Sequence, residues 1–352
     1  MTNSATLDQL SCPLPLPHNQ MIVMGHGSGG KMTHDLIQKT FLKALSNPIL
    51  LSKDDAAKIN VEGHRMAVST DSHVVFPLFF PGGDIGKLAV CGTVNDVSML
   101  GAQPLYLTAG FILEEGLEIV ILEKVLDSIR LAAEEAGVFI VAGDTKVVQK
   151  GKADGLYITT CGIGRIPPGI DISGNHAHQG DVVIVSGTIG DHGIAVLEAR
   201  NELGFKSGIK SDVAPLNHLV EAILSTGSPI HVLRDPTRGG LATTLNEIAI
   251  QSQVCILLDE SSIPVTKEVS AVCEILGYDP LYVANEGKLI VILPEHKVSD
   301  VLEKMRNSPY GEQSSIIGKV SASPKGRVLM QTSLGTTRIV DMLSGEMLPR
   351  IC

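Results

Sequence analysis

The feature that most constrains this chain is an order of strand, polar turn and helix that recurs through most of its length. Apolar runs at 138–142 and 181–185 have the length of buried strands, and each leads into a turn rich in glycine and hydroxyl or carboxyl side chains. The segment from Glu118 carries apolar residues at steps of three and four, which is the spacing of one helix face. Alternating strands and helices predict an α/β (α+β) chain.

A stiff turn, Pro167-Pro168-Gly169, separates two stretches of this pattern. We therefore predict two α/β domains and a flexible C-terminal tail, because the 352 residues exceed the usual size of one domain. The predicted division is 1–60 for an N-terminal extension and glycine-rich loop, 61–167 and 168–333 for the two domains, and 334–352 for the tail. Other predicted strands cover 21–24, 65–70, 105–113, 156–163, 254–258 and 289–293, and other predicted helices start at Lys31, Gly86, Asp191, Ala214, Gly240 and Thr266.

Composition and charge exclude several classes of protein. The chain has 28 Lys and Arg against 38 Asp and Glu, a net charge of −10, which argues against binding nucleic acid. No apolar run is long enough to cross a membrane, and the N-terminus lacks the pattern of a signal peptide. The six cysteines are scattered without a CxxC pair, so a disulfide scaffold and a structural zinc site are both disfavoured. We expect a cytoplasmic protein.

A glycine cluster, Gly25-His26-Gly27-Ser28-Gly29-Gly30-Lys31, lies between a predicted strand and a predicted helix. Backbone N–H groups in such a loop can bind an anion at the helix start. The spacing also fits the P-loop pattern, but Met32 stands where that pattern needs a metal-binding hydroxyl. An anion site and a simple flexible loop therefore both remain open for this segment.

Four aspartates, Asp71, Asp96, Asp144 and Asp235, mark a candidate magnesium site. Three follow predicted strands, and ligands of α/β sheets gather at the carboxyl ends of strands. Magnesium prefers carboxylate and water oxygens. Each aspartate alone is also an ordinary turn former or helix cap. Asp96 differs because it interrupts an otherwise apolar helix, where a carboxylate needs a partner.

Further polar turns resemble ligand loops or ordinary strand-to-helix turns. The turn at 187–193 is rich in glycine, and the turn at 235–241 combines Thr237, Gly239 and Arg238, whose guanidinium can hold an anion. A third polar turn, at 284–288, precedes an apolar strand and contains Glu286.

The last residue, Cys352, ends a tail that contains Gly345 and Pro349. Prenylation requires a cysteine four residues from the end, so that modification is excluded. The other cysteines, apart from Cys12 in the N-terminal extension, fall in predicted helices and strands, where thiols act as small core groups. The tail is either an incidental chain end or an arm that carries a group on the Cys352 sulfur.

Five motifs together resemble a known superfamily: HGSGGK at 26–31, VNDV at 94–97, GDTK at 143–146, DPTRGG at 235–240 and NEG at 285–287. They are similar to motifs of aminoimidazole ribonucleotide synthetase, selenophosphate synthetase and thiamine-monophosphate kinase. The ending PRIC at 349–352 singles out the HypE family, the carbamoyl dehydratases of NiFe-hydrogenase maturation. The resemblance runs from His26 to the last residue and leaves residues 1–20 without a role.

The resemblance implies a two-domain aminoimidazole ribonucleotide synthetase-like fold and a homodimer that pairs through the sheets of the N-terminal domains. ATP and Mg²⁺ would bind near that interface. Asp71, Asp96 and Asp235 would hold the metal. The nucleotide-binding residues implied are Gly27, Gly29, Gly30, Lys31, Asp144, Thr145, Thr237, Arg238 and Gly239.

The resemblance also implies the reaction. A partner carbamoyltransferase, HypF, would load a carbamoyl group onto Cys352, and the amide oxygen would attack the γ-phosphoryl group of ATP. Loss of phosphate would leave a thiocyanate, whose cyanide passes to iron on a HypC–HypD scaffold. Glu286 would be the base and Lys146 its charge partner. Alternatives are a small-molecule kinase of the same superfamily and a nucleotide-binding assembly factor without catalysis.

Overall fold

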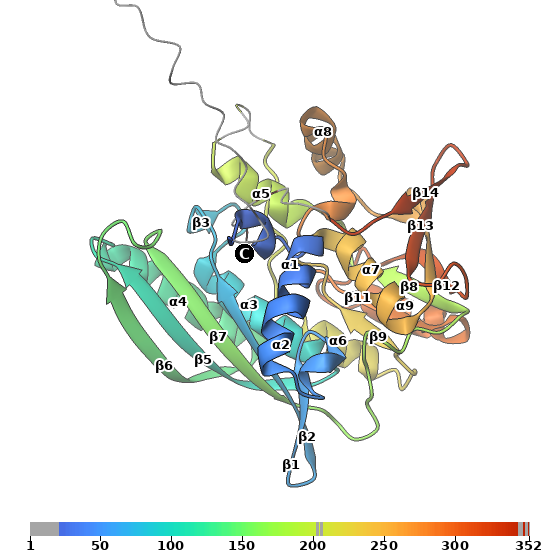
Figure 1. Cartoon of the computed structure of the whole chain (residues 1–352), viewed down its shortest axis with the longest axis horizontal. Helices are drawn as coiled ribbons and strands as arrows, with labels where there is room; N and C mark the ends of the chain where they lie inside the picture. Colours follow the sequence, from blue (N-terminus) through green and yellow to red (C-terminus); the bar gives the residue numbers. More distant parts are fainter. Residues whose placement is uncertain (1–20, 202–203, 205–206, 344–347, 349–350, 352) are drawn as a thin grey trace, which may run out of the picture.

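The computed structural model describes residues 21–201, 204, 207–343, 348 and 351. Two large β-sheets with their helices lie side by side, and a helical segment that precedes the first sheet lies across their junction (Figure 1). A short hairpin, β3 (Phe79–Phe80) with β4 (Gly83–Asp84), belongs to the first half. The architecture is a mixed α/β fold, as the sequence predicted.

The first sheet has the strand order β1-β2-β7-β5-β6, in which only β5 and β6 run parallel. Helices α3 (Ile85–Ser98) and α4 (Ile119–Ala136) cover one face (Figure 1). The opposite face stays open over β5 and β6, where Tyr106, Ile112 and Phe139 are exposed. The strands are β1 (Ala57–Val61), β2 (His64–His73), β5 (Gln103–Glu114), β6 (Phe139–Val148) and β7 (Leu156–Arg165).

Helix α3 connects the two halves of the molecule. Its first turn is capped by Asp84, whose side chain accepts hydrogen bonds from the backbone N–H groups of two residues of that turn. Glycine at 164 lets the helix approach β7, since a Cβ there would lie 2.4 Å from Cγ1 of Val97. On its other side, Asn95 donates to the carbonyl oxygen of Ala214 in the second half at 3.1 Å. Helix α3 is therefore buried almost all round.

The second sheet has the strand order β14-β13-β10-β12-β8-β11-β9. Its strands are β8 (Asp181–Val185), β9 (Val232–Arg234), β10 (Cys255–Asp259), β11 (Ile290–Pro294), β12 (Ser315–Ser321), β13 (Arg327–Gln331) and β14 (Thr337–Val340). The helices of this half are α5 (Asp191–Ala199), α6 (Asn217–Leu224), α7 (Gly240–Ser252), α8 (Lys267–Leu276) and α9 (Val298–Arg306).

Every residue of β8 is buried because helices pack on both faces of this sheet. Val183 and Val185 join one apolar core with Leu245 of α7. Val182 and Ile184, which point to the other face, join a second core with α6 and α9. The continuous apolar run at 181–185 is thus explained by burial on two sides.

The segment before the first sheet corrects one prediction. The strand expected at 21–24 is absent, and the chain there leads into a short 3₁₀ turn, η2 (Met24–Gly27). The helix expected from Lys31 is confirmed as α1 (Lys31–Leu36), continued by η3 (Ile37–Phe41) and α2 (Leu42–Leu45). Its apolar side is exposed at Ile37, Phe41 and Leu45. Turn η4 (Leu50–Ser52) follows.

Several other elements differ from the prediction in their limits. β2 and β6 continue through Asp71 and Asp144, which therefore lie inside strands. In α4 the buried face contains Val125, Ile129 and Ala133, whereas Ile119 is exposed. α6 starts at Asn217 and not at residue 214. The helices from Asp191, Gly240 and Thr266 are confirmed, with Thr266 as the N-cap of α8.

In the described part of the chain, no helix is both long and apolar enough to cross a membrane. Cys91, Cys255 and Cys273 are buried free thiols, as expected, but Cys161 is only half-buried. Burial raises the pKa of Cys273 to about 11, which disfavours a reactive thiolate. Cys12 and Cys352 lie outside the described residues.

Candidate active site

Three of the predicted metal ligands converge from separate elements of both halves. Asp71 comes from β2, Asp96 from α3, and Asp235 directly follows β9. Helix α3 approaches β2 closely at Gly92, where a Cβ would lie 3.5 Å from Oδ2 of Asp71. Asp96 accepts a hydrogen bond from the hydroxyl of Ser69 at 2.7 Å. The fold thus gathers the three aspartates that the sequence pointed to.

These carboxyl groups carry more negative charge than their surroundings neutralise. Burial and then the charges of Asp235, Asp71 and Asp55 raise the pKa of Asp96 well above its usual range. Burial also raises the pKa of Asp235 to about 6. The guanidinium of Arg238 is 4.0 Å from Asp71 and about half exposed. A group of mutually repelling carboxylates, of which Asp235 is buried and Asp71 and Asp96 are half-buried, fits a hard cation such as Mg²⁺.

Asp55 is a member of this acidic cluster that the sequence did not single out. It lies before β1, and its Oδ1 is 2.9 Å from Nε of Arg234. Arg234 also binds Glu247, so its charge is already shared between two carboxylates. The signal in the sequence was the pair Asp54-Asp55, which resembles an ordinary polar turn.

Glu286 is buried beside the same cluster. Burial and then Asp71, Asp235 and Asp212 raise the pKa of Glu286 well above its usual value. Its Oε1 is buried and has no hydrogen-bond partner among the described residues. A carboxyl group with a high pKa and an unused oxygen can accept a proton from a molecule placed next to it.

The backbone around Glu286 is held firmly. Its N–H donates to Oδ1 of Asp212 at 3.0 Å, and Lys288 donates to the other oxygen of Asp212 at 3.0 Å. Asn95 of α3 donates to the Glu286 carbonyl at 3.4 Å and accepts from the N–H of Leu216 at 2.8 Å. Asp212, which the sequence analysis missed, therefore positions Glu286 without facing solvent.

The described end of the tail lies next to this turn. Ile351 is buried in the same apolar core as Ala284, two residues before Glu286. His192 of α5 has its Nε2 2.6 Å from the carbonyl oxygen of Ile351. Leu348 also packs against this core. The start of α5 therefore links the two segments, since His192 bonds to Ile351 and the N–H of Gly193 donates to the Ala284 carbonyl at 3.1 Å, whereas Cys352 itself is outside the described residues.

The glycine cluster contacts both the turn after β9 and the chain after β14. A Cβ at Gly29 would lie 2.9 Å from the Arg238 carbonyl oxygen, so the two loops touch. Gly30 packs on the carbonyl of Leu343, which accepts the N–H of Lys31 at 2.8 Å. The Lys31 ammonium donates to Asp341 at 3.0 Å. Both the backbone and the side chain of Lys31 are thus hydrogen-bonded to residues 341–343. A Cβ at Gly27 would meet no other atom within 4 Å.

The turn after β9 is shaped by glycine. Gly239 caps α7 with φ of 78° and Gly240 has φ of 61°, a left-handed conformation that a side chain would disfavour. The N–H of Thr237 donates to the carbonyl of Asp235 at 3.1 Å. This compact turn holds Asp235 and Arg238 next to each other at the start of a helix.

Asp144, Thr145 and Lys146 lie on β6, away from the acidic cluster. The register pairs Asp144 with Gly110 and Lys146 with Ile112, which places both on the open face of the sheet. Asp71 lies on the face covered by α3. Lys146 donates to Asp144 at 2.6 Å and both are exposed, so the expected pairing of Lys146 with Glu286 is not formed within one chain.

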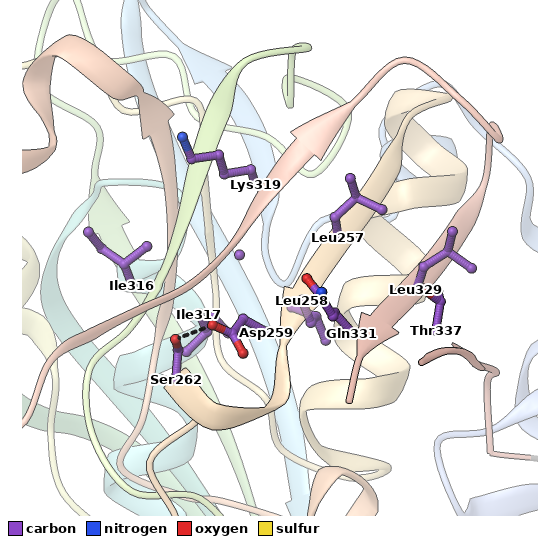
Figure 2. Close-up of a pocket in the computed structure, with 11 residues that line it drawn as sticks. Leu257, Leu258, Asp259, Ser262, Ile316, Ile317, Lys319, Leu329, Gln331 and Thr337 are labelled. Carbon is purple, nitrogen blue, oxygen red and sulfur yellow. Dashed lines mark hydrogen bonds between the residues drawn. The ribbon is translucent and has the colours of Figure 1, made fainter. Parts of the chain in front are cut away.

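A separate hollow of about 450 Å³ lies over β10, β12 and β13 (Figure 2). Its lining is mainly apolar, with Leu257, Ile316 and Leu329 among it, and Ser262 donates to Asp259 at its edge. None of the predicted site residues lines this hollow. The acidic cluster is therefore the candidate active site.

Comparisons with known proteins identify the family and the fold of the chain. The family "AIR synthase related protein, N-terminal domain" matches residues 53–166, and its C-terminal counterpart matches 178–331. Carbamoyl dehydratase HypE of Azotobacter vinelandii is 53% identical over 334 residues, which cover 95% of this chain and 98% of that protein.

Two solved structures are similar over most of the chain. A crystal structure of a HypE–HypF complex gives a TM-score of 0.84 at 50% identity, covering 88% of this chain and 99% of that one. Hydrogenase maturation protein HypE in complex with ATP gives 0.79 at 52% identity, covering 94% and 100%. The predicted aminoimidazole ribonucleotide synthetase-like fold is confirmed. By its sequence and its fold, the chain belongs to the HypE family of carbamoyl dehydratases.

Proposed function

We propose that this chain is the ATP-dependent carbamoyl dehydratase of hydrogenase maturation, and that it acts on a carbamoyl group carried by its own Cys352. The observation that carries the proposal is the place of Ile351, which is buried and whose carbonyl is bonded to His192. The N–H of Gly193, the residue after His192, donates to Ala284 in the turn before Glu286. The Glu286 carboxyl, buried and with an unpartnered Oε1, is the group that we propose acts on a carbamoyl group carried by the residue after Ile351.

In the proposed reaction, HypF first transfers a carbamoyl group to the Cys352 sulfur. The carbamoyl oxygen then bonds to the γ-phosphorus of ATP as the bond to ADP breaks, and one nitrogen proton is lost. Removal of the second nitrogen proton breaks the carbon–oxygen bond and releases phosphate. The product is a thiocyanate on sulfur, and the net change is the loss of one water. The cyanide then passes to iron on the HypC–HypD scaffold.

Glu286 is proposed as the base for these proton transfers. Burial and the neighbouring carboxylates raise the pKa of Glu286 well above its usual value, which makes its carboxylate a stronger proton acceptor. The unused Oε1 can accept an N–H of the carbamoyl group. Asp212 and Asn95 keep the Glu286 backbone in place, which is the positioning that such a step needs.

Mg²⁺ is proposed to bind Asp71, Asp96 and Asp235, whose converging carboxylate oxygens fit a hard cation. When bound, it supplies positive charge that stabilises phosphoryl oxygens. ATP supplies the phosphoryl group. Two loops are proposed to bind the nucleotide, because they touch at Gly29 and each leads into the start of a helix. Their residues are Gly27, Gly29, Gly30 and Lys31 in the first loop and Thr237, Arg238 and Gly239 in the second. Lys31 would first have to leave Asp341.

We further propose a homodimer formed through the open face of the first sheet. Tyr106, Ile112 and Phe139 expose apolar side chains there, on neighbouring strands. Pairing of two such faces would cover them. It would also bring Asp144 and Lys146, which lie on this face, against the second copy, where they could bind the nucleotide of that copy.

The proposed function is tested by ATP turnover. Chain loaded by HypF and carbamoyl donor should form ADP, whereas unloaded chain and the Cys352→Ala variant should form none above background. ADP formation on addition of small hydroxylated molecules, independent of Cys352, would favour the kinase alternative. ATP binding without ADP formation under any of these conditions would favour an assembly factor.

A further inference from the structure

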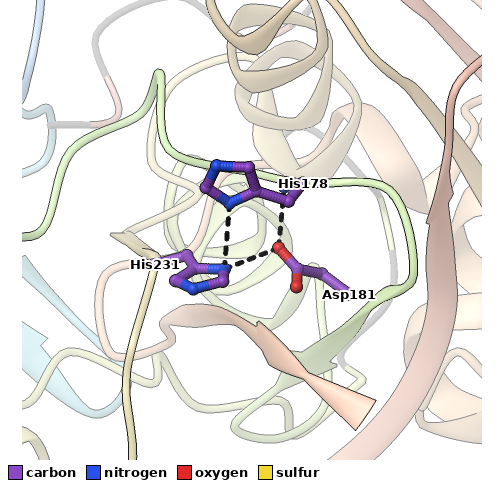
Figure 3. Close-up of side chains that lie close together, drawn as sticks. All are labelled: His178, Asp181 and His231. Atoms are coloured by element: carbon purple, nitrogen blue, oxygen red, sulfur yellow. Dashed lines mark hydrogen bonds and ion pairs between the residues drawn. The ribbon is translucent and has the colours of Figure 1, made fainter.

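A second cluster of metal-ligating side chains lies outside the proposed active site. His178, Asp181 and His231 meet in the second half of the molecule (Figure 3). Nδ1 of His178 is 3.4 Å from Nδ1 of His231, and Nδ1 of His231 is 2.8 Å from Oδ2 of Asp181. The three ligand atoms all lie within 4.8 Å of one another.

The three facing atoms, Nδ1 of His178, Nδ1 of His231 and Oδ2 of Asp181, have more lone pairs than there are protons between them. Only one proton, on Nδ1 of His231, can lie between that nitrogen and its two neighbours, the Asp181 carboxylate and the His178 nitrogen. If His178 also carried a proton on Nδ1, two N–H groups would face each other at 3.4 Å. Three atoms with lone pairs therefore lie within 4.8 Å of one another, and a single cation can replace the one shared proton.

The separation of the two histidine nitrogens fits a tetrahedral metal ion. Zn²⁺ binds imidazole nitrogen at about 2.0–2.1 Å, so two nitrogens on one tetrahedral ion lie roughly 3.3 Å apart. The observed separation of the two histidine nitrogens is 3.4 Å. Two imidazoles and one carboxylate form a ligand set that prefers zinc and its neighbours over magnesium, which prefers oxygen alone.

The ligands are held in place before any ion binds. Asp181 is buried at the start of β8, and its Oδ2 accepts the backbone N–H of His178 at 2.7 Å. The N–H of Asp181 donates back to the His178 carbonyl at 3.1 Å, which closes a tight turn. His231 precedes β9, and its N–H donates to the carbonyl of Ile292 in β11 at 3.0 Å. His178 is exposed, which leaves a path to solvent and room for a water ligand.

We propose that His178, Asp181 and His231 form a binding site for a divalent transition ion of the zinc type. β8 and β9 both pair antiparallel with β11, so they run in the same direction and the cluster lies at their starting ends. Asp235 follows the other end of β9. The ion therefore joins the turn at 178–181 to the chain before β9, away from the acidic cluster, and its role is structural. The scattered cysteines disfavour a zinc site with cysteine ligands, whereas the ligands of this cluster are two histidines and an aspartate.

The test is a Zn²⁺ titration of full-length chain that has been stripped with a chelator, in excess Mg²⁺, against a chromophoric competitor. We expect one tight Zn²⁺ per chain and at least tenfold weaker binding in His178→Ala and His231→Ala. Co²⁺ in place of Zn²⁺ should give the visible absorption of a tetrahedral site. His64→Ala, an exposed histidine in the first sheet, and Cys352→Ala should bind Zn²⁺ as the parent does.

His178 is exposed, so His178→Ala should keep its fold and can decide the question alone if His231→Ala does not fold. The proposal is overturned if the parent binds no stoichiometric Zn²⁺. It is also overturned if His178→Ala binds as tightly as the parent, or if Cys352→Ala removes the bound ion. Since Zn²⁺ binding is read without ATP turnover, its failure would leave the proposed dehydratase reaction untouched.

Discussion

Nε2 of His192 lies 2.6 Å from the carbonyl oxygen of Ile351, the residue before the C-terminal cysteine. A carbonyl can only accept, so Nε2 carries the hydrogen. Nδ1 is then free to accept from the hydroxyl of Ser211 at 2.8 Å. Burial lowers the pKa of His192, which keeps the ring neutral in this arrangement. The end of the tail is therefore held by one oriented hydrogen bond from α5.

The first prediction concerns this bond. His192→Leu removes the donor and should slow dehydration of a carbamoylated tail by about two- to tenfold, since a buried neutral hydrogen bond contributes about 0.5–1.5 kcal/mol. Single-turnover formation of thiocyanate measures the effect. His192→Gln, which keeps an N–H near the same place, should recover most of the rate. Loading by HypF should be unchanged in both variants, and equal loss in loading and dehydration would indicate a merely structural role.

The second prediction concerns the acidic cluster. Asp96→Asn removes one of the mutually repelling carboxyl groups, so the chain without metal should melt at a higher temperature. The same variant should bind Mg²⁺ and ATP at least tenfold more weakly in calorimetry. Asp127→Asn, an exposed aspartate of α4, should change neither quantity. Unaltered Mg²⁺-dependent ATP binding in Asp96→Asn would contradict the metal assignment.

The third prediction is a pH dependence. The pKa of Asp235 is raised from 3.8 to about 6, so between these values the folded chain holds a proton that the unfolded chain has released. Stability from this group is present at low pH and is lost as the pH rises to about 6. Mg²⁺ must displace the proton, so its affinity should fall roughly tenfold per unit below pH 6. Calorimetry across this pH range measures how stability and Mg²⁺ affinity change with pH, and Asp235→Asn is the control.

The fourth prediction concerns the open sheet face. Ile112→Arg places a charge in the centre of the proposed dimer interface and should convert the chain to a monomer in light scattering. Leu334→Arg, an exposed leucine in the turn before β14, should leave the dimer intact. The monomer should also lose ATP affinity, because Asp144 and Lys146 would no longer face a second copy. A monomeric parent chain would refute the interface.

Much of the fold was predictable because apolar spacing reports burial directly. The run at 181–185 and the helix from Gly240 were found for this reason. The sheet face on which a residue lies was not predictable from the sequence. Asp144 and Asp71 lie on opposite faces, and this follows only from the strand registers of β6 and β2. Asp55 and Asp212 resemble turn residues in sequence. The contact of His192 with Ile351 joins distant parts of the chain and leaves no local pattern.

The central claim is that Cys352 carries the group that is dehydrated beside Glu286. Intact mass of the full chain, after incubation with HypF, carbamoyl donor and ATP, tests it most directly. The account predicts one carbamoyl adduct that loses the mass of one water when ATP is present. Glu286→Gln should hold the carbamoyl adduct without that loss, and Cys352→Ala should gain no adduct. A dehydrated adduct on another cysteine, or normal dehydration in Glu286→Gln, would contradict the account.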